Sequence, residues 1–325
     1  MNRRDFLRQS SLLAAVGCLS RVGLFGQTAT TTPAGAGATK APATGGAGFG
    51  EFRELRRGVG TFSGRGGTIG WLSSKDALAV VDTQFPDSAA IFLAGMPGRG
   101  GRTIDVVLNT HHHADHTSGN PVFRPVAKTI VAQANVPKLQ FEAAKRAEQA
   151  KSASATAADQ LVFADTTFPD VWRHEFPDEV IRAQFHGPAH TSGDAVVMLE
   201  KANVVHMGDL VFNRMHPVID RPSGASVRGW IVVLEDAVKT YPADAIYIFG
   251  HGSPKFGVTG KRDDLLVMRD YWSAVLGLVE KQIASGTTRE AVVALKSVPG
   301  FTTLDPSSRL GSNLAAAFDE LTTKA

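Results

Sequence analysis

Four of the ten histidines in this 325-residue chain lie within seven residues, at spacings that suit metal binding. The stretch reads Thr110-His111-His112-His113-Ala114-Asp115-His116, and an apolar, β-branched run before it predicts a buried strand that ends at the motif. Side chains alternate along an extended segment, so His111 and His113 can reach one cation while His112 faces elsewhere. A turn after this point would bring Asp115 and His116 to a second cation.

Two further histidines and an aspartate follow in the chain, each at the end of a predicted strand. They are His190 in the glycine-flanked loop 187–194, Asp209 in 207–210, and His251 between two glycines in 246–252. Small neighbouring residues allow the backbone to approach a metal closely. Imidazole and carboxylate without sulfur suit Zn²⁺, Fe or Mn²⁺, with zinc as the expected metal at a mixed nitrogen and oxygen site.

These ordered motifs, beginning with H-x-H-x-D-H, resemble the metallo-β-lactamase superfamily of dinuclear metallohydrolases over roughly residues 55–260. The resemblance implies an α/β fold, an αββα sandwich of two mixed β-sheets flanked by helices, with the site along one edge. It also implies two metal sets: His111, His113 and His190 on one metal, Asp115, His116 and His251 on the other, and Asp209 bridging them.

The activity implied by the resemblance is that of a dinuclear zinc hydrolase. Two cations about 3.5–4 Å apart bind one hydroxide between them and lower the pKa of its parent water. That hydroxide would attack an ester, thioester, lactone or amide, as in glyoxalase II-like or lactonase-like chemistry. Asp115 is the candidate to orient the hydroxide and pass a proton to the leaving group. Diiron relatives carry Glu at the position of His113, which favours zinc here.

Three alternative functions stay open from the sequence. A mononuclear iron persulfide dioxygenase shares the first motif but uses only two histidines and an aspartate, so the intact second ligand set argues against it. β-Lactamase activity is disfavoured because zinc β-lactamases carry Cys or Ser near the position of Asp209. The third alternative is a non-catalytic metal-binding protein, which metal content and a hydrolysis panel would distinguish from an enzyme.

The amino terminus predicts export. Residues 1–27 contain Arg3-Arg4 followed by a short apolar run, which is typical of a twin-arginine signal. This predicts a periplasmic or otherwise extracytoplasmic location, with the twin-arginine export machinery as a partner. Cys18, the only cysteine, lies in a sequence that weakly resembles a lipoprotein box and would then carry a lipid anchor. The mature domain has no thiol to bind a metal.

Residues 28–51 are rich in Ala, Thr, Gly and Pro and predict a flexible linker. Residues 52–325 then form the metallo-β-lactamase-fold domain with a helical C-terminal extension. Residues 1–51 carry five Lys and Arg against two Asp and Glu, which accounts for the formal net charge of +3. The folded part is therefore neutral, which argues against nucleic acid as a partner and favours a small-molecule substrate.

The hydrophobic pattern predicts two rounds of strands and helices. We expect strands at 59–62, 68–72, 77–81, 105–109, 166–172, 180–185, 195–199, 204–207 and 245–249, and helices at 88–94, 135–151, 227–240, 263–285, 289–296 and 307–322.

Asp82 should hydrogen-bond the ligand loop, and Trp230 should lie in the core. His216 is expected as an exposed loop residue, with substrate contact as the alternative. His174, His186 and His206 should be ordinary surface or packed residues. Substrate specificity should reside in loops 62–68, 150–165 and 212–226.

Overall fold

The computed structural model describes residues 50–151, 160–304 and 309–323. The predicted signal segment 1–27, Cys18 and nearly all of the predicted linker lie outside these residues, as does 152–159 within one of the predicted specificity loops. The first strand begins at Glu51, the last residue assigned to the linker. Within the described ranges, none of the helices combines the length and the apolar character needed to cross a bilayer.

The first sheet has seven strands in sequential order, β1 to β7. They are β1 Glu51–Arg56, β2 Val59–Ser63, β3 Ile69–Ser73, β4 Leu78–Val81, β5 Val106–Asn109, β6 Ile130–Gln133 and β7 Thr166–Phe168. β1 to β4 form an antiparallel meander, and β4 to β7 pair in parallel. Parallel neighbours end at the same edge, so the loop after β5 leaves the sheet beside the turn after β4.

The second sheet has six strands in the order β15-β13-β11-β10-β9-β8. They are β8 Val171–Glu175, β9 Val180–Phe185, β10 Ala195–Leu199, β11 Val204–His206, β13 Ile246–Ile248 and β15 Thr259–Gly260. β11 and β13 pair in parallel, and the other neighbours pair antiparallel. A separate parallel pair joins β12 Phe212–Asn213 to β14 His251–Gly252.

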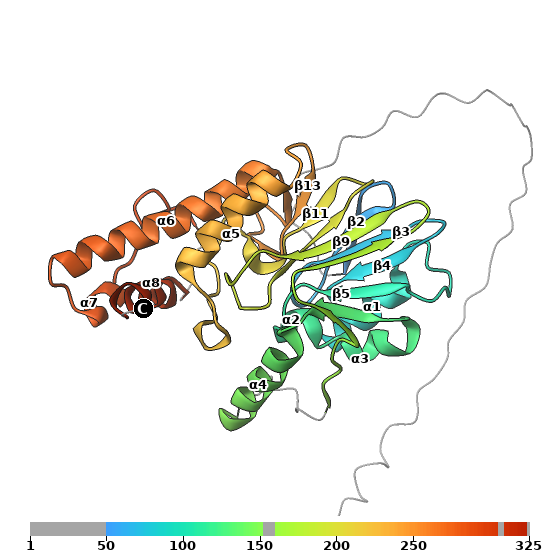
Figure 1. The fold of residues 1–325 in the computed structure, drawn as a ribbon, viewed down its shortest axis with the longest axis horizontal. Helices are drawn as coiled ribbons and strands as arrows, with labels where there is room; N and C mark the ends of the chain where they lie inside the picture. Colours follow the sequence, from blue (N-terminus) through green and yellow to red (C-terminus); the bar gives the residue numbers. More distant parts are fainter. Residues whose placement is uncertain (1–49, 152–159, 305–308, 324–325) are drawn as a thin grey trace, which may run out of the picture. The chain divides into compact units, whose positions relative to one another are not determined.

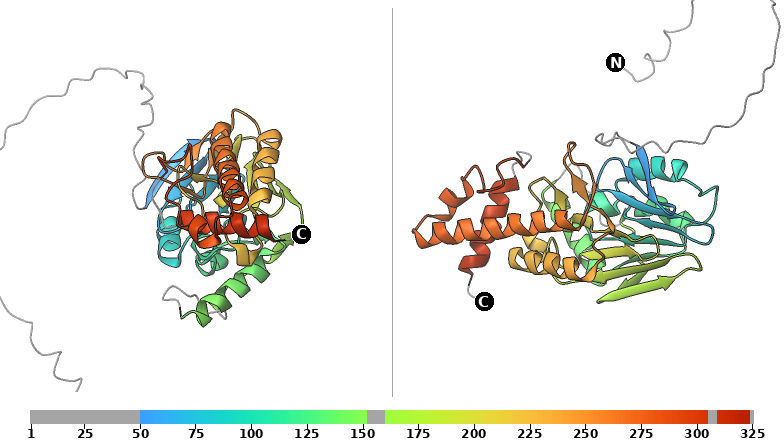
Figure 2. Two further views of the ribbon diagram at one scale, coloured as in Figure 1. Left: turned by 90° about the vertical axis from the view of Figure 1, so that its left-hand side faces the viewer. Right: turned by 90° about the horizontal axis from the view of Figure 1, so that it is seen from above.

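The two sheets lie face to face, and helices cover their outer faces (Figures 1 and 2). Between the sheets, residues such as Val81 and Leu108 from the first pack with Val197 and Ile248 from the second. The helices are α1 Pro86–Gly95, α2 Ala114–Thr117, α3 Asn120–Phe123, α4 Val136–Gln149, α5 Val227–Thr240, α6 Arg262–Ala284, α7 Arg289–Val293 and α8 Arg309–Thr322. This arrangement confirms the predicted αββα sandwich of two mixed sheets.

Each outer face has its own apolar core. Phe92 of α1 and Phe123 of α3 pack with Trp71 on the first sheet. On the second sheet, Trp230 of α5 and Trp272 of α6 lie 4.9 Å apart between ring centroids and are fully buried. Trp230 is therefore a core residue, as predicted. α8 packs against α6, α7 packs against α8, and both extend this layer, whereas α4 projects from the domain (Figure 1).

The predicted strand 166–172 is wrong as a single element. The chain leaves β7 in the first sheet at Phe168 and enters β8 in the second sheet at Val171. Pro169 lies between them and has no N–H to donate, which favours a break in strand pairing there. The hydrophobic pattern of the sequence also failed to predict β6, which is a run of only four residues. By contrast, β9, β10 and α5 have the predicted bounds.

Candidate metal centre

All seven residues predicted as metal ligands meet at one edge of the sandwich. Their nitrogen and oxygen atoms form two groups within which the atoms lie no more than 4.8 Å apart. The first group is His111, His113, His190 and Asp209, and the second is Asp115, His116 and His251. They lie in the segments that follow β5, β9, β11 and β13, among them α2 with Asp115 and His116 and β14 with His251, so the sandwich edge positions each of them.

In the first group, three imidazole nitrogens point at one another. Nε2 of His190 lies 3.3 Å from Nε2 of His111 and 3.0 Å from Nδ1 of His113. Oδ2 of Asp209 lies 3.6 Å from Nε2 of His190 and 3.9 Å from Nε2 of His111. His111, His190 and Asp209 are almost completely buried, whereas the side chain of His113 is 20% exposed. The group therefore has one side open to solvent.

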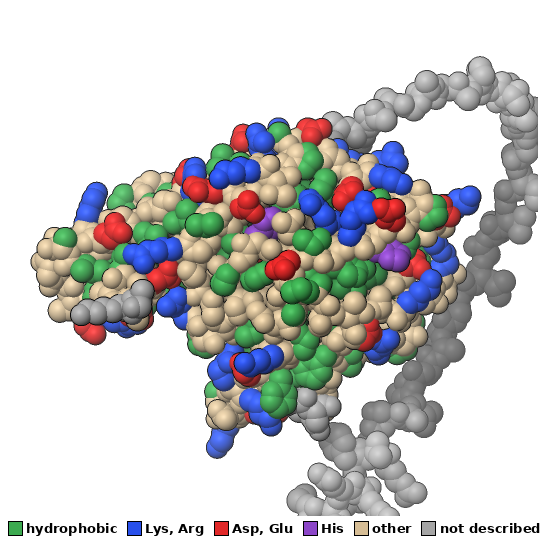
Figure 3. Space-filling view, viewed as in Figure 1, with side chains coloured by type: hydrophobic (Ala, Val, Ile, Leu, Met, Phe, Trp, Pro, Cys, Tyr) green, Lys and Arg blue, Asp and Glu red, His purple; other side chains and the backbone are tan. Residues whose placement is uncertain are grey.

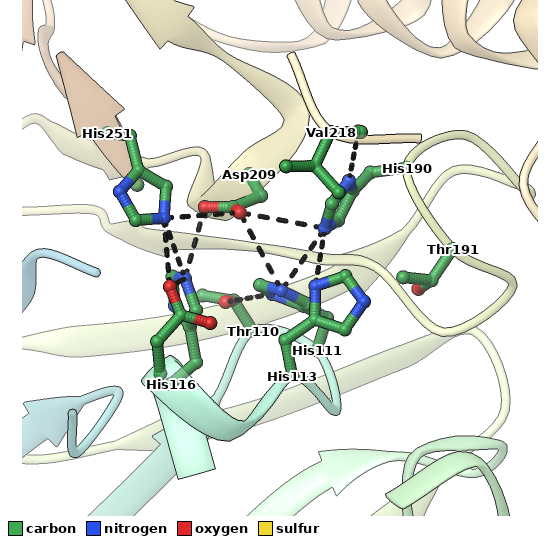
Figure 4. A network of polar contacts seen from close by, with 12 residues as sticks. Thr110, His111, His113, His116, His190, Thr191, Asp209, Val218 and His251 are labelled. Carbon is green, nitrogen blue, oxygen red and sulfur yellow. Dashed lines mark hydrogen bonds and ion pairs between the residues drawn. The ribbon is translucent and has the colours of Figure 1, made fainter. Parts of the chain in front are cut away.

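The second group lies on the other side of Asp209. Nε2 of His116 lies 3.1 Å from Oδ1 of Asp209, and Nε2 of His251 lies 3.4 Å from Oδ2 of the same carboxylate. Oδ2 of Asp115 lies 3.1 Å from Nε2 of His251. Figure 4 shows Asp209 between the two groups, with His251 on one side and His190 on the other. One carboxylate thus faces both groups, which is the arrangement of a bridging ligand.

Asp82 orients the rings of His116 and His111 from the side away from the centre, the second of them through Thr110. Its carboxylate accepts hydrogen bonds from the Thr110 backbone N–H at 2.7 Å, from the Thr110 hydroxyl at 2.8 Å and from Nδ1 of His116 at 2.7 Å. Because the Thr110 hydroxyl donates to Asp82, it must accept from Nδ1 of His111, 3.1 Å away. Nε2 of each ring therefore faces the site, and Nε2 of His111 is unprotonated. The predicted role of Asp82 is confirmed.

The other two rings of the first group are held in the same way. Nδ1 of His190 donates to the carbonyl oxygen of Val218 at 2.9 Å. Nε2 of His113 donates to Oδ2 of Asp220 at 3.0 Å, which leaves Nδ1 of His113 facing the site. Asp220 was not found from the sequence, because it lies 107 residues after His113 and in no motif. Only the folded loop before α5 brings the two together.

The donor atoms fit a cation in the first group. Three ring nitrogens meet there, and those of the neutral His111 and His190 rings present lone pairs that a cation between them would bind. Burial lowers the pKa of His190 to about 3 and holds the pKa of His111 well below its usual value, so both rings are neutral at neutral pH. Oδ2 of Asp209 faces the same point, 3.6 Å from Nε2 of His190 and 3.9 Å from Nε2 of His111. A cation would satisfy all of these atoms.

The second group needs positive charge for a different reason. Burial disfavours a charged His116, but the nearby carboxylates of Asp209 and Asp115 outweigh burial and raise its pKa well above the usual value. The same balance, in which Asp209 outweighs burial, raises the pKa of His251 to about 9. Protons or a cation can supply this charge, and the oxygen and nitrogen ligands suit a divalent metal.

Two glycines make room for the second group. A Cβ atom on Gly67 would lie 2.1 Å from Cε1 of the His116 ring, and a Cβ on Gly250 would lie 1.9 Å from Oδ1 of Asp209. Both contacts are far closer than a carbon atom allows, so only glycine fits at either position. Gly250 belongs to the glycine pair predicted around His251, whereas Gly67 was not singled out from the sequence.

A family model for the metallo-beta-lactamase superfamily matches residues 63–251, which is more than half of the chain and contains all seven candidate ligands. The chain belongs to the metallo-beta-lactamase superfamily. Members of this superfamily are mostly metal-dependent hydrolases, and membership together with the histidine and aspartate groups implies bound metal ions. No curated protein sequence matches the chain.

Solved structures of this superfamily share the fold at low sequence identity. A stereoselective inverting sec-alkylsulfatase from Pseudomonas sp. is 15% identical with a TM-score of 0.60, and the match covers 83% of this chain. The chain spans only 50% of that sulfatase. A metallo-beta-lactamase from Pontibacter korlensis is 17% identical with a TM-score of 0.54, covering 69% of this chain and 98% of that one. A metallo-beta-lactamase from Hirschia baltica is 18% identical with a TM-score of 0.54, covering 68% and 97%.

His112 lies beside the two groups without joining either. Its Nε2 lies 3.4 Å from Oδ2 of Asp220 and 3.3 Å from the hydroxyl oxygen of Ser223. His112, His113 and Asp220 could themselves hold a cation by distance. However, the Asp220 carboxylate is already used to orient His113, so we interpret the set as support for the first group. The prediction that His112 faces away from the ligands agrees with this placement.

The prediction for His216 is wrong. The residue is buried, at 6% exposure, and its Nδ1 lies 2.9 Å from the hydroxyl of Tyr271 on α6. Its neighbours in sequence suggest an exposed loop, but the helical extension covers that loop. His206 is a packed residue, as expected, with Nε2 donating to the carbonyl of Thr68 at 3.1 Å.

Proposed function

We propose that this protein is a dinuclear zinc hydrolase that cleaves an ester, thioester, lactone or amide bond. The observation that supports it best is the shared carboxylate: Asp209 faces His116 and His251 on one side and His190 on the other. A mononuclear iron site would leave the second group without a purpose. We also propose that the chain is exported through a twin-arginine signal to an extracytoplasmic location.

Each proposed zinc ion has its own ligand set. His111, His113 and His190 would hold one, Asp115, His116 and His251 the other, and Asp209 both. When bound, the two ions would polarise the scissile carbonyl and lower the pKa of a water molecule between them. The chain contributes the orientation of the rings, through Asp82, Val218 and Asp220.

Asp115 is the residue that can move a proton. Its side chain is 30% exposed, against 3% for Asp209, so substrate can reach it. Burial disfavours the ionised form of Asp115, but the charge of His116 and a hydrogen bond from His251 outweigh burial and hold its pKa well below the usual range. Asp115 is therefore an unprotonated carboxylate at neutral pH. It can accept a proton from the attacking water and deliver it to the leaving atom.

A hydrolysis panel tests this proposal. Purified protein would be assayed on p-nitrophenyl esters, thioesters, lactones, anilides and a β-lactam, before and after chelator treatment and again after zinc is restored. We expect turnover of at least one carbonyl substrate, loss with the chelator and recovery with zinc. Zinc-loaded protein that turns over none of them, or activity that needs one iron and consumes oxygen with a persulfide, would contradict it.

A further inference from the structure

A cavity adjoins the open side of the metal centre. Its volume is about 280 Å³, near the lower end for pockets that bind small molecules. One wall comes from the α2 region with His113 and Asp115, and the other from α4 with Ala143 and Ala147. A single water needs only about 10–15 Å³ of such space, so the cavity can hold a side group of several non-hydrogen atoms. Its position beside Asp115 places such a group next to the reacting bond.

Two buried polar groups on the cavity wall have no hydrogen-bond partner among the residues that the structure describes. Gln140 is 4% exposed, and neither its Oε1 nor its Nε2 makes a hydrogen bond. Nδ1 of His112, which also lines the cavity, is unpartnered as well. Leaving such a group unsatisfied costs about 1–3 kcal/mol, so native structures contain few of them. A glutamine amide that both donates and accepts is suited to a hydroxyl, keto or amide group of a ligand.

The remaining wall is uncharged and mostly apolar. Ala143, Ala144 and Ala147 present only methyl groups, and Leu161 adds a larger apolar surface. Among the described lining residues there is no Lys or Arg, and Asp115 is the one carboxylate. Arg146, one turn from Ala143, instead donates to the hydroxyl of Ser223 at 2.9 Å. An anionic group such as a sulfate would therefore meet no cationic side chain here and is disfavoured.

We propose that this α2–α4 pocket binds the side group of an uncharged, mainly aliphatic or aromatic substrate, and that Gln140 hydrogen-bonds one polar group on it. The substrate class is thus a neutral carboxylic ester or lactone rather than an anionic ester. This inference rests on the proposed hydrolase function. Hydrophobic side chains gather where α4 meets the body of the domain (Figure 3), which gives such a substrate an apolar approach.

The first test fills the pocket. Ala147→Phe places a ring in the cavity, and Ala90→Phe on the exposed side of α1 is the matched control. Ethyl and p-nitrophenyl esters with acyl chains of two to eight carbons vary the side group. The readout is the ratio of kcat/KM for the long-chain esters to kcat/KM for the acetate esters. We expect Ala147→Phe to lower this ratio at least tenfold and Ala90→Phe to leave it unchanged. An equal ratio in the two variants would overturn the proposal.

The second test needs no turnover, so it separates failure of the pocket from failure of the hydrolase proposal. Calorimetry would measure the binding of hexanamide, an uncharged probe with one polar group. We expect binding to wild type and to Ala90→Phe, and at least tenfold weaker binding to Ala147→Phe and to Gln140→Leu. Equal binding of hexanamide to all four proteins, or no binding to wild type, would overturn the proposal that this pocket binds substrate. Binding of hexanamide without hydrolysis of any ester would refute only the proposed hydrolase function.

The Tm of Gln140→Leu gives a further test. A glutamine with a purely structural role and a glutamine that binds ligand predict opposite changes in Tm. Replacing an unpartnered buried amide by an apolar side chain of similar size removes a desolvation cost. We therefore expect Tm to stay equal or to rise in Gln140→Leu, while hexanamide binding falls. A lower Tm with hexanamide binding retained would assign Gln140 a structural role and contradict the proposal.

Discussion

At the residue scale, the centre depends on ring orientation as much as on ligand identity. Four of the five ligand histidines have their outer nitrogen hydrogen-bonded to an oxygen, which leaves the inner nitrogen free. Residue types and their order along the chain are sequence features, so the resemblance to the superfamily was enough to select the seven residues that the structure brings together. Partners such as Asp220 and Val218 are positioned only by the fold, so no local pattern indicates them.

Asp115→Asn separates proton transfer from metal binding. The amide keeps an oxygen near His251 but can neither accept nor deliver the proton, so we expect a rate loss of about 10²-fold or more on alkyl esters or lactones. A p-nitrophenyl ester should lose less, because its leaving group departs without protonation. Metal content should fall less than in His111→Ala. Equal losses on both substrates, with metal retained, would leave Asp115 as a ligand only.

Gly67→Ala tests the space around His116. The added methyl would overlap the ring, which Asp82 holds in place, so we expect a destabilisation of about 1–3 kcal/mol and reduced metal content. Gly277→Ala on α6 is the control, because its Cβ meets nothing within 4 Å. That variant should keep its metal and gain up to about 1 kcal/mol from helix propensity. Normal metal content in Gly67→Ala, measured by elemental analysis, would contradict the predicted overlap between the added methyl group and the His116 ring.

At the element scale, the C-terminal helix α8 holds the loop that carries Asp220. Glu320 of α8 accepts hydrogen bonds from the backbone N–H groups of Val227 and Arg228 at 2.8 and 3.0 Å, at the start of α5. It also accepts from the Ser226 hydroxyl at 3.1 Å. A carboxylate at a helix N-terminus is stabilising. The helical extension is thereby linked to the loop that orients His113.

Glu320→Ala should therefore cost more than an ordinary surface change. Four donors, among them the guanidinium of Arg221, would lose a charged acceptor, and we expect the free energy of unfolding to fall by about 2 kcal/mol. Asp319→Ala, next in the same helix, removes an exposed ion pair with Arg289 and should cost less than about 1 kcal/mol. Urea unfolding of both variants gives the comparison. Equal losses would mean that α8 does not anchor this loop.

The elements that the sequence predicted well have strong local patterns. α5 combines regular apolar spacing with a Ser226 cap, and its bounds agree with the prediction. The chain between β7 and β8 was mistaken for one strand because its apolar and aromatic residues continue across Pro169. His216 was placed at the surface because the covering helix α6 begins nearly fifty residues later. Both errors arise from contacts that are distant in sequence.

At the scale of the whole molecule, the chain combines a folded domain of the metallo-beta-lactamase superfamily with an amino-terminal segment whose sequence predicts export. Replacing Arg3 and Arg4 by Lys should leave the protein in the cytoplasm, because the paired arginines are the feature the export machinery reads. Cell fractionation, with a Lys40→Arg variant as the control, gives the readout. Export of the double-lysine variant at the wild-type level would refute the twin-arginine signal.

The central claim is a centre of two zinc ions that share Asp209, and the metal content per chain tests it most directly. Elemental analysis of the purified protein should give close to two zinc ions per chain. His190→Ala, which removes one ligand of the first group, should lower the content towards one. His174→Ala, an exposed histidine outside both groups, should leave it at two. One tightly bound iron per chain in the wild-type protein, with no zinc, would contradict the account.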